Sequence, residues 1–362
     1  MRIAIDAREL IGKPTGVGRY LAEIVAAWGQ LPGAAAHEIV LCAPEPVRLS
    51  SPGALRATVV TAPGAGTLWE QRALPRLVAS ARADVLFAPG YTGPLRGDVP
   101  IVLTIHDVSF AAHPEWFSWR EGLRRRLLTR LSARRAARVI TVSDFSKREI
   151  VRHLGIPQSK VEVIYSGATT LERRGDDDRT RRDPLVLFVG SLFNRRHVPE
   201  LVDGFTRLAR RHPAARLEIV GDNRTRPHVD VDRLIAHSGV ADRIRARSYV
   251  SDEELSSLYA RASAFAFLSD YEGFAMTPLE AVAAAVPVVL LETEVAREIY
   301  GPAAIYVERA DPALIEGALE RALFDEGERA WLCEAGATQL ARYSWRECAQ
   351  RTLQVILACA RT

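Results

Sequence analysis

Short apolar runs alternate with helical patterns along this chain, and such an alternation is typical of parallel α/β units. In the first half, the runs that predict buried strands are "IAID", "EIVLC", "DVLFAP", "IVLTIH", "RVITVS" and "VEVIY". The alternation restarts with "LVLFVG", "RLEIVG", "IRARSYV", "AFAFLS", "PVVLL" and "AAIYV". The pattern predicts two Rossmann-like, doubly wound parallel sheets, with ligands at the carboxyl ends of the strands, in the cleft that the two domains would face.

The two series of strands are separated by "TTLERRGDDDRTRRDP", which is polar and almost free of large apolar residues. Such a composition is typical of a linker between domains. We therefore expect a first domain at 1–168, a linker at 169–183 and a second domain at 184–344. The tail at 345–362 predicts an amphipathic helix that crosses back to the first domain.

Charge and cysteine content narrow the class of protein. The formal net charge is +4, which suits an anionic ligand or surface but is too small to indicate nucleic acid. The four cysteines show no C-x-x-C spacing, so we interpret them as thiols in a reducing, cytoplasmic compartment. We expect no signal peptide and no membrane-spanning segment, because acids come early in "MRIAIDAREL" and no apolar run is long enough.

The stretch "SDYEGFAMTPLEAVAAAVPVV" places two carboxylates around a turn that follows a predicted strand. Thr277, Pro278 and Glu280 match a helix start, with Glu280 as a capping-box acid. That interpretation leaves Glu272 unexplained. Gly273 would let a ligand approach the backbone closely, and free N–H groups at a helix start suit phosphate oxygens. Two acids that flank such a turn suggest one ligand with a sugar, a diphosphate and a ribose.

This stretch resembles the E-x7-E signature of retaining glycosyltransferases of family 4, which have the GT-B fold. Further blocks that resemble the family's mannosyltransferase-like members include "TGVGRYLAEI", "TIHDVSFAAHPEWF", "TVSDFSKREIVRHLGIP" and "LFVGSLFNRRH". The resemblance implies that Glu272 contacts the donor sugar and Glu280 the nucleotide ribose. It also implies that the backbone of Gly273, Phe274 and Ala275 lies near the sugar and diphosphate.

Arg195 and Arg196 would stand just before a helix that begins at about Pro199. They are either solvated surface arginines or a diphosphate site. A cation near a helix N-terminus is disfavoured by roughly 0.3–1 kcal/mol unless an anion joins it, which favours the diphosphate site. The family usually has Arg-Lys here, so Arg196 occupies the lysine position.

Three candidates in the first domain depend on the resemblance. "KPTGVGRY" places Gly16 and Gly18 between a strand and a helix, without the dinucleotide-binding fingerprint. They form either a flexible loop or, as in the family, a loop over the donor phosphates. His106 follows a strand; a lone histidine is more often a packed residue, but the resemblance places it near the donor hexose as a catalytic group. Asp107 would orient a neighbour.

Two acidic clusters, at 176–178 and 230–232, resemble a metal-binding D-x-D. Neither follows a convincing strand end, so we interpret both as solvated acids and predict no metal and no cofactor. The segment 117–139 carries leucines at helical spacing among many arginines. It is either an ordinary amphipathic helix with its leucines in the core, or a basic face that rests on anionic lipid.

The resemblance implies a metal-independent enzyme that transfers a hexose, with retention, from a nucleotide diphosphate sugar to a hydroxyl acceptor. GDP-mannose is the first expectation for the donor, and a polysaccharide or lipid-linked glycan for the acceptor. Ala275, Leu268 and Ala285 depart from the family's usual Gly, Pro and Gly. The alternatives are a silent GT-B binding subunit, and a nucleotide-sugar epimerase or hydrolase of the same fold.

Overall fold

The computed structural model describes residues 1–12, 16–49, 53–168 and 183–360. Internal contacts divide the chain into one unit of Met1–Gly167 with Tyr343–Thr362, and a second unit of Ala168–Arg342. The C-terminal helix thus belongs to the first unit. All of the expected linker except Asp183 lies outside the described residues.

The first unit contains a parallel sheet whose strand order, in the described residues, is β3-β2-β1-β4-β5-β6-β7. β4 and β5 are buried at every position, because helices cover both faces of the sheet. The predicted runs account for all the strands except β3, which the sequence reading missed. Most of the β3 side chains are exposed, so no continuous apolar run marks it. The strands are β1 (Arg2–Asp6), β2 (Glu38–Ala43), β3 (Arg56–Thr61), β4 (Val85–Ala88), β5 (Ile101–Thr104), β6 (Arg138–Thr141) and β7 (Val161–Val163).

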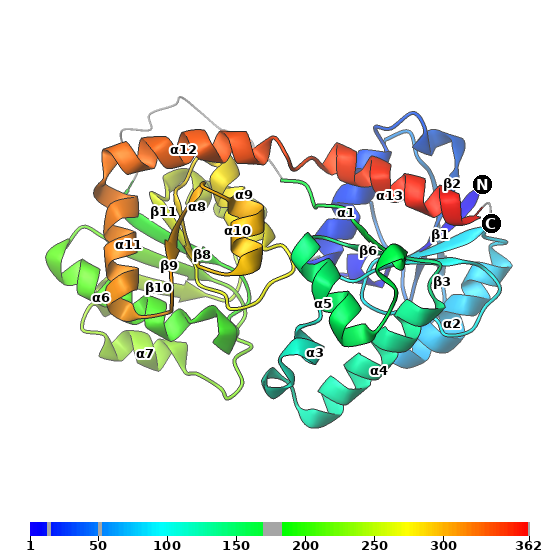
Figure 1. Cartoon of the computed structure of the whole chain (residues 1–362), viewed down its shortest axis with the longest axis horizontal. Helices are drawn as coiled ribbons and strands as arrows, with labels where there is room; N and C mark the ends of the chain where they lie inside the picture. The colour runs from blue at the N-terminus through cyan, green and yellow to red at the C-terminus, as the bar shows by residue number, and fades with distance from the viewer. Residues whose placement is uncertain (13–15, 50–52, 169–182, 361–362) are drawn as a thin grey trace. The chain divides into compact units, whose positions relative to one another are not determined.

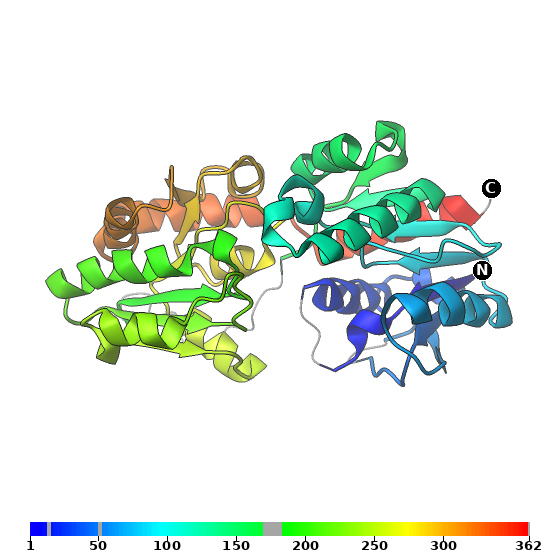
Figure 2. The ribbon, with the colours of Figure 1, turned by 90° about the horizontal axis from the view of Figure 1, so that it is seen from below.

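Helices α2, α4 and α5 lie on one face of this sheet, where their apolar side chains share one core cluster. Helix α1 lies on the other face together with the C-terminal helix, which Figure 2 shows behind the strands. The C-terminal helix packs against α1 and against β4, β5 and β6 (Figure 1). The indole Nε1 of Trp28 donates a hydrogen bond of 2.8 Å to the Ala349 carbonyl, and both residues are fully buried. The helices are α1 (Val17–Trp28), α2 (Gly66–Ser80), α3 (Ser109–Ala112), α4 (Trp119–Arg135), α5 (Asp144–Leu154) and α13 (Trp345–Ala360).

The second unit has a parallel sheet in the order β10-β9-β8-β11-β12-β13, again for the described residues. The strands are β8 (Leu185–Val189), β9 (Arg216–Val220), β10 (Ile244–Arg247), β11 (Ala264–Phe267), β12 (Val288–Leu291) and β13 (Ala304–Val307). The helices are α6 (Val198–Arg211), α7 (Val231–His237), α8 (Asp252–Arg261), α9 (Met276–Ala283), α10 (Glu294–Tyr300), α11 (Pro312–Phe324) and α12 (Glu326–Leu340). The predicted class, two doubly wound parallel α/β units, is confirmed.

One expectation about packing is wrong. The leucines of the 117–139 segment do not point into the first unit: Leu123 and Leu127 are 55% and 54% exposed, and Leu131 is 36% exposed. The buried face of α4 instead consists of small or polar residues, which allow the helix to lie close to the sheet. These residues are Gly122, Thr129, Ser132 and Ala133.

Candidate functional site

The candidate site of the second unit lies where its strand order reverses. β8 is the first strand of this sheet along the chain and lies between β9 and β11, so the loops after β8 and β11 leave the sheet side by side. This is the point at which open α/β sheets bind ligands. Close packing here also requires glycine: a Cβ on Gly221, which follows β9, would lie 2.0 Å from the carbonyl oxygen of Gly190, which follows β8.

Arg196 ends a short 3-10 turn (Asn194–Arg196) in the loop after β8, and it reaches across to the loop after β11. Its Nε and Nη2 lie 2.9 and 2.8 Å from Oε1 of Glu272, and its Nη1 donates to the Ser191 carbonyl at 2.8 Å. The guanidinium also lies 4.7 Å from the ring centroid of Phe267. Only 12% of the Arg196 side chain is exposed, so the surrounding protein holds it in place.

Glu272 receives its contacts on one carboxylate oxygen. Ser269 Oγ donates to Oε1 at 2.8 Å, and Arg196 donates to the same oxygen. Among the described residues, no hydrogen bond to Oε2 is present. The carboxylate is therefore anchored through one oxygen, while the other can accept a hydroxyl of a ligand.

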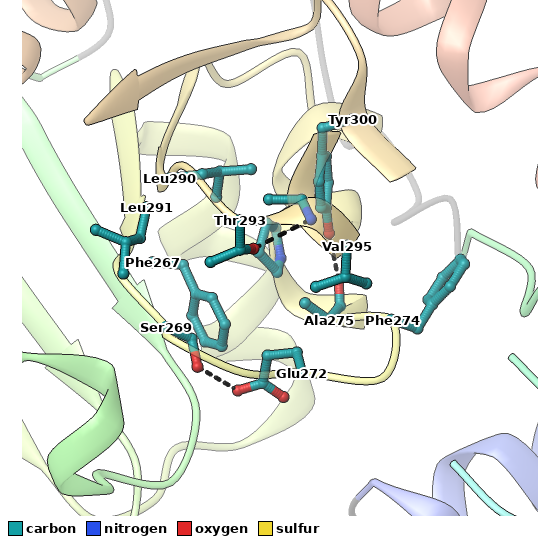
Figure 3. Close-up of a pocket in the computed structure, with 12 residues that line it drawn as sticks. Phe267, Ser269, Glu272, Phe274, Ala275, Leu290, Leu291, Thr293, Val295 and Tyr300 are labelled. Atoms are coloured by element: carbon teal, nitrogen blue, oxygen red, sulfur yellow. Dashed lines mark hydrogen bonds between the residues drawn. The ribbon is translucent and has the colours of Figure 1, made fainter. Parts of the chain in front are cut away.

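A small hollow that is open to solvent lies beside this carboxylate (Figure 3). Ser269, Glu272, Phe274 and Ala275 line one side of it, and the side chains from β12 and α10 are mainly apolar. The Tyr300 hydroxyl donates to the Ala275 carbonyl and so closes one end of the loop (Figure 3). A sugar fits such a lining, because sugars present apolar C–H faces as well as hydroxyl groups. Three of the predicted donor residues, Glu272, Phe274 and Ala275, thus share one pocket.

The capping-box interpretation of Glu280 is wrong. Ala275 adopts a left-handed conformation with φ of 63°, so α9 starts at Met276 and not after Thr277. Glu280 then lies inside the helix, 3% exposed, where Tyr259 donates its hydroxyl to Oε2 at 3.0 Å. It does not line the hollow beside Glu272 as the described residues define it. Its predicted role at the ribose stays a prediction.

The sequence reading missed a second link between these two loops. His197, at the N-cap of α6, lies 2.8 Å from Oδ2 of Asp270 and 3.5 Å from Oε1 of Glu200. Hydrogen bonds to Asp270 and then to Glu200 raise the pKa of His197 to about 9, although burial opposes this. The Asp270 backbone N–H donates to the Arg195 carbonyl at 2.9 Å, and the Arg195 guanidinium lies over the Phe193 ring. Both arginines thus stand just before α6, as predicted.

Gly16 and Gly18 occupy different environments in the first unit. Gly16 is the N-cap of α1, has φ of 52°, and a Cβ there would meet nothing within 4 Å. Gly18 is buried inside the first turn of α1, so the expectation that it belongs to a loop is wrong. Residues 13–15 of the predicted loop lie outside the described residues.

His106 follows β5 and is held by its surroundings. Its Nε2 lies 2.9 Å from the Pro89 carbonyl oxygen, and the Tyr20 ring packs edge-on at 4.8 Å. Burial lowers the pKa of His106, so the ring is neutral at neutral pH. Asp107 accepts from the Tyr91 hydroxyl at 2.8 Å, as an orienting residue would. These contacts fit a packed histidine, and its predicted place near the donor hexose is not tested.

A buried ionic cluster at the end of β1 was also missed. Arg8 Nη2 lies 2.6 Å from Asp6 Oδ2 and 2.7 Å from Glu70 Oε2. Thr92 and Gln71 donate to the two oxygens of Glu70 at 2.6 and 2.7 Å. The two acids of the cluster pair with its one cation, and these contacts join α2 to the end of β1. Its members are far apart in sequence, so no local pattern reveals it.

Among the residues that the structure describes, no three His, Cys, Asp or Glu side chains converge in a way that could hold a metal ion. Asp230 instead caps α7 by accepting from the Arg233 N–H at 2.9 Å. The cluster at 176–178 lies outside the described residues. No described helix has both the length and the apolar character needed to cross a membrane.

Two family models match successive parts of the chain. Residues 14–170 match the model described as Glycosyltransferase Family 4, and residues 172–339 match Glycosyl transferases group 1. Together the two matches span almost the whole chain. The chain therefore belongs to the group 1 glycosyltransferases of family 4, and it is an enzyme of the glycosyltransferase class.

Curated relatives agree with this class. The chain is 26% identical to O-antigen chain mannosyltransferase B of Escherichia coli over 269 residues, which is 70% of this chain and 68% of the relative. It is 28% identical to the MMP alpha-(1->4)-mannosyltransferase of Mycolicibacterium hassiacum over 272 residues, 71% of this chain and 64% of the relative. Several of the curated relatives are matched over slightly less than two thirds of their own length.

Solved structures share the fold over nearly the full length. Anabaena Alr3699/HepE in complex with UDP-glucose superposes with a TM-score of 0.76 at 20% identity, covering 99% of this chain and 100% of that one. WaaG, a glycosyltransferase involved in lipopolysaccharide biosynthesis, gives 0.76 at 16% identity, with 98% and 99% covered. These similarities confirm the GT-B fold.

Proposed function

We propose that this enzyme transfers a hexose from a nucleotide diphosphate sugar to a hydroxyl acceptor, with retention of the anomeric configuration. Mannose, carried by GDP, is the first candidate, because relatives named as mannosyltransferases are among the matches. The observation that carries the proposal is the Arg196–Glu272 pair beside the hollow at the strand switch point. It supplies a fixed cation and a carboxylate oxygen at one place.

Each member of the pair has a separate task in this proposal. Arg196, with Arg195 and the first turn of α6, would hold the diphosphate through charge-assisted hydrogen bonds. Glu272 Oε2 would accept a sugar hydroxyl, since Oε1 is already engaged. Removal of a positioned carboxylate of this kind costs catalysis about 10²–10³-fold when its contact strengthens in the transition state.

The reaction we propose takes place on one face of the sugar. The acceptor oxygen forms a bond to the anomeric carbon on the side from which the diphosphate departs. The bond between that carbon and the phosphate oxygen breaks, its electron pair stays with the diphosphate, and a phosphate oxygen takes the acceptor's proton. Arg196 and the α6 N-terminus would stabilise the leaving group, so the proposal includes no metal and no cofactor.

The acceptor we propose is a glycan, free or lipid-linked, reached from the cytoplasm. Four free cysteines among the described residues support a reducing compartment. A peripheral contact of the 117–139 segment with the inner face of the membrane would bring a lipid-linked acceptor within reach. The exposed apolar and basic side chains of α4 support the proposal of that contact.

A donor panel tests the function. We expect one nucleotide sugar to raise the unfolding temperature more than its free nucleotide does. We also expect NMR of the product to show a retained anomer in the presence of EDTA.

Two variants test the role of Glu272. Glu272→Gln should lower turnover at least about 100-fold with little change in nucleotide affinity. Glu326→Gln changes an exposed acid on α12 and should leave both turnover and nucleotide affinity unchanged. An inverted product would refute retention. Product formed without any acceptor would indicate the epimerase or hydrolase, and unchanged nucleotide release in Glu272→Ala would indicate the silent subunit.

A further inference from the structure

The turn after β4 holds a bulky residue in a backbone conformation that favours glycine. Tyr91 has φ of 65°, in the left-handed region, and its side chain is half-buried. A residue of this size is strained there, and it keeps the conformation only where the surrounding structure over-determines it. Such strain is concentrated at functional sites, so the contacts of Tyr91 indicate what the strained turn achieves.

The two residues after Tyr91 hold the turn in this shape. Thr92 Oγ1 donates at 2.6 Å to Oε2 of Glu70, a member of the buried ionic cluster. The Gly93 N–H donates to the hydroxyl of Ser132, on α4, at 3.2 Å. Both acceptors are almost fully buried, with 2% of Glu70 and 3% of Ser132 exposed. Helices α2 and α4 therefore fix the backbone immediately after Tyr91.

This turn places the Tyr91 side chain against the segment that follows β5. The Tyr91 hydroxyl donates to Asp107 Oδ2 at 2.8 Å, and the Tyr91 and His106 ring centroids are 5.6 Å apart. The carbonyl oxygen of Pro89, in the same turn, lies 2.9 Å from His106 Nε2. Because a carbonyl oxygen only accepts, Nε2 carries the proton of the neutral ring, and Nδ1 is the nitrogen that can accept a hydrogen bond. The turn thus contacts both His106 and Asp107.

The turn stands at the switch point of the first sheet. β1 is the first strand along the chain and lies between β2 and β4, so the loops after β1 and β4 leave the sheet side by side. A Cβ on Gly90 would lie 3.6 Å from Cγ1 of Val17, so the turn also lies against the start of α1, which Gly16 caps. The turn therefore contacts both segments that carry the first-unit candidates, the start of α1 and the end of β5.

We propose that Tyr91 is a positioning residue of the transfer reaction, which orients the Asp107 carboxylate and, through it, the His106 ring toward the substrate. The Asp107 charge favours the protonated imidazole, and the tyrosine hydroxyl offsets part of that charge. The ring therefore stays neutral, and its Nδ1 can accept a substrate hydroxyl. Packing alone does not account for the arrangement, since glycine would form the same turn without strain and phenylalanine would fill the same space. The inference rests on the proposed function and adds a residue of the first unit to it.

An NMR titration of the imidazole carbons tests the proposal without any substrate. Tyr91→Phe should raise the pKa of His106, because Asp107 loses the donor that offsets its charge. Tyr91→Phe/Asp107→Ala should give a pKa no higher than that of the wild type, since the carboxylate is gone. The matched control, Tyr165→Phe, removes another tyrosine hydroxyl that donates to an aspartate, Asp144, at 3.1 Å. It should leave the pKa of His106 unchanged.

Release of GDP from GDP-mannose measures the effect on catalysis. Tyr91→Phe should lower kcat at least about tenfold and change KM less than about threefold, because the substrate still binds while the groups beside it are misoriented. In the Asp107→Ala background, Tyr91→Phe should change kcat less than about twofold, since a residue that acts through Asp107 then has nothing to position. Tyr165→Phe should keep the kcat of the wild type.

Three results would overturn the proposal: an unchanged pKa of His106 in Tyr91→Phe, an unchanged kcat in that variant, or losses of kcat that multiply in the double variant. A wild type that does not turn over GDP-mannose would count against the proposed donor. The pKa of His106 in the three variants would then decide the role of Tyr91 by itself.

Discussion

The His197–Asp270 link predicts that the loop after β11, which carries Glu272, loosens at high pH. The imidazole lies between Asp270 and Glu200, which keep it charged, and their hydrogen bonds raise its pKa from 6.5 to about 9. Since His197 begins α6 and Asp270 lies two residues before Glu272, the link holds the Glu272 loop against the start of that helix. Deprotonation of His197 would remove the charge-assisted part of this contact.

The magnitude follows from the shift. A rise from 6.5 to about 9 corresponds to roughly 3 kcal/mol of preference for the charged form in the folded state. The partner carboxylates, Asp270 and Glu200, are 41% and 37% exposed, so screening by solvent reduces the expected stabilisation to about 1–2 kcal/mol. Because the folded pKa is the higher one, this stabilisation is complete below about pH 6.5 and is lost as the pH rises through 9.

NMR titration of the imidazole carbons measures the pKa directly, with His197→Asn to assign the resonance. Asparagine tolerates the φ of 49° at this position, so the variant keeps the backbone of the N-cap. Hydrogen exchange of the segment around Asp270, corrected for intrinsic rates, should show its opening free energy fall by about 1–2 kcal/mol between pH 7 and 10. His197→Asn should abolish that fall. The reasoning is wrong if the His197 resonance titrates near 6.5, or if the variant shows the same pH dependence as the wild type.

Three further predictions concern single residues. Ala285→Gly should stabilise the second unit by about 1 kcal/mol, because residue 285 has φ of 53°, and calorimetry measures the change. The control, Ala283→Gly in the last turn of α9, should destabilise the unit by a similar amount. Tyr259→Phe should cost about 1.5–3 kcal/mol, since it removes the hydroxyl that donates to the buried Glu280 carboxylate, and a urea titration with no change would contradict this. Burial keeps His106 neutral and its pKa low, so the stability of the first unit should fall as the pH drops below about 6.5; His106→Gln should remove this dependence.

Buried strands could be predicted from the sequence, because each is a short apolar run between polar segments. The edge strand β3 could not be predicted in this way, since its side chains are mostly exposed. The switch point between β8 and β11 is a property of strand order, which a linear pattern does not contain. The resemblance to the family nevertheless selected Arg196 and Glu272, which the fold brings within 2.8 Å of each other across 76 positions of sequence.

The start of α9 shows why a local pattern can mislead. Thr277, Pro278 and Glu280 satisfy the rules for a capping box, yet the helix begins at Met276 because Ala275 turns the chain in the left-handed region. An alanine in that region costs roughly 1–2 kcal/mol, so sequence alone gives no reason to expect one there. Ala275 and Ala285 stand where the family usually has glycine, and both have positive φ. At these two positions the residue differs from the family's usual glycine, while the backbone keeps the positive φ that glycine favours.

The cations at the start of α6 pair with acids of the loop after β11 and of α6 itself. Arg196 is paired with Glu272, and His197 with Asp270 and Glu200, so the cations and acids at the start of α6 largely neutralise one another. A diphosphate that bound there would therefore meet a rigid, nearly neutral surface, and its affinity would depend on Arg195 and on the backbone N–H groups of α6 more than on net charge. Hydrogen-bond donors that are already fixed require no reorganisation as the sugar–phosphate bond breaks. They therefore stabilise the negative charge that develops on the leaving diphosphate more than the charge already present on the bound nucleotide sugar. A phosphate site built for tight ground-state binding would instead leave its arginines unpaired. The paired state of Arg196 is thus the feature that most strongly favours a catalytic site over a storage or binding site.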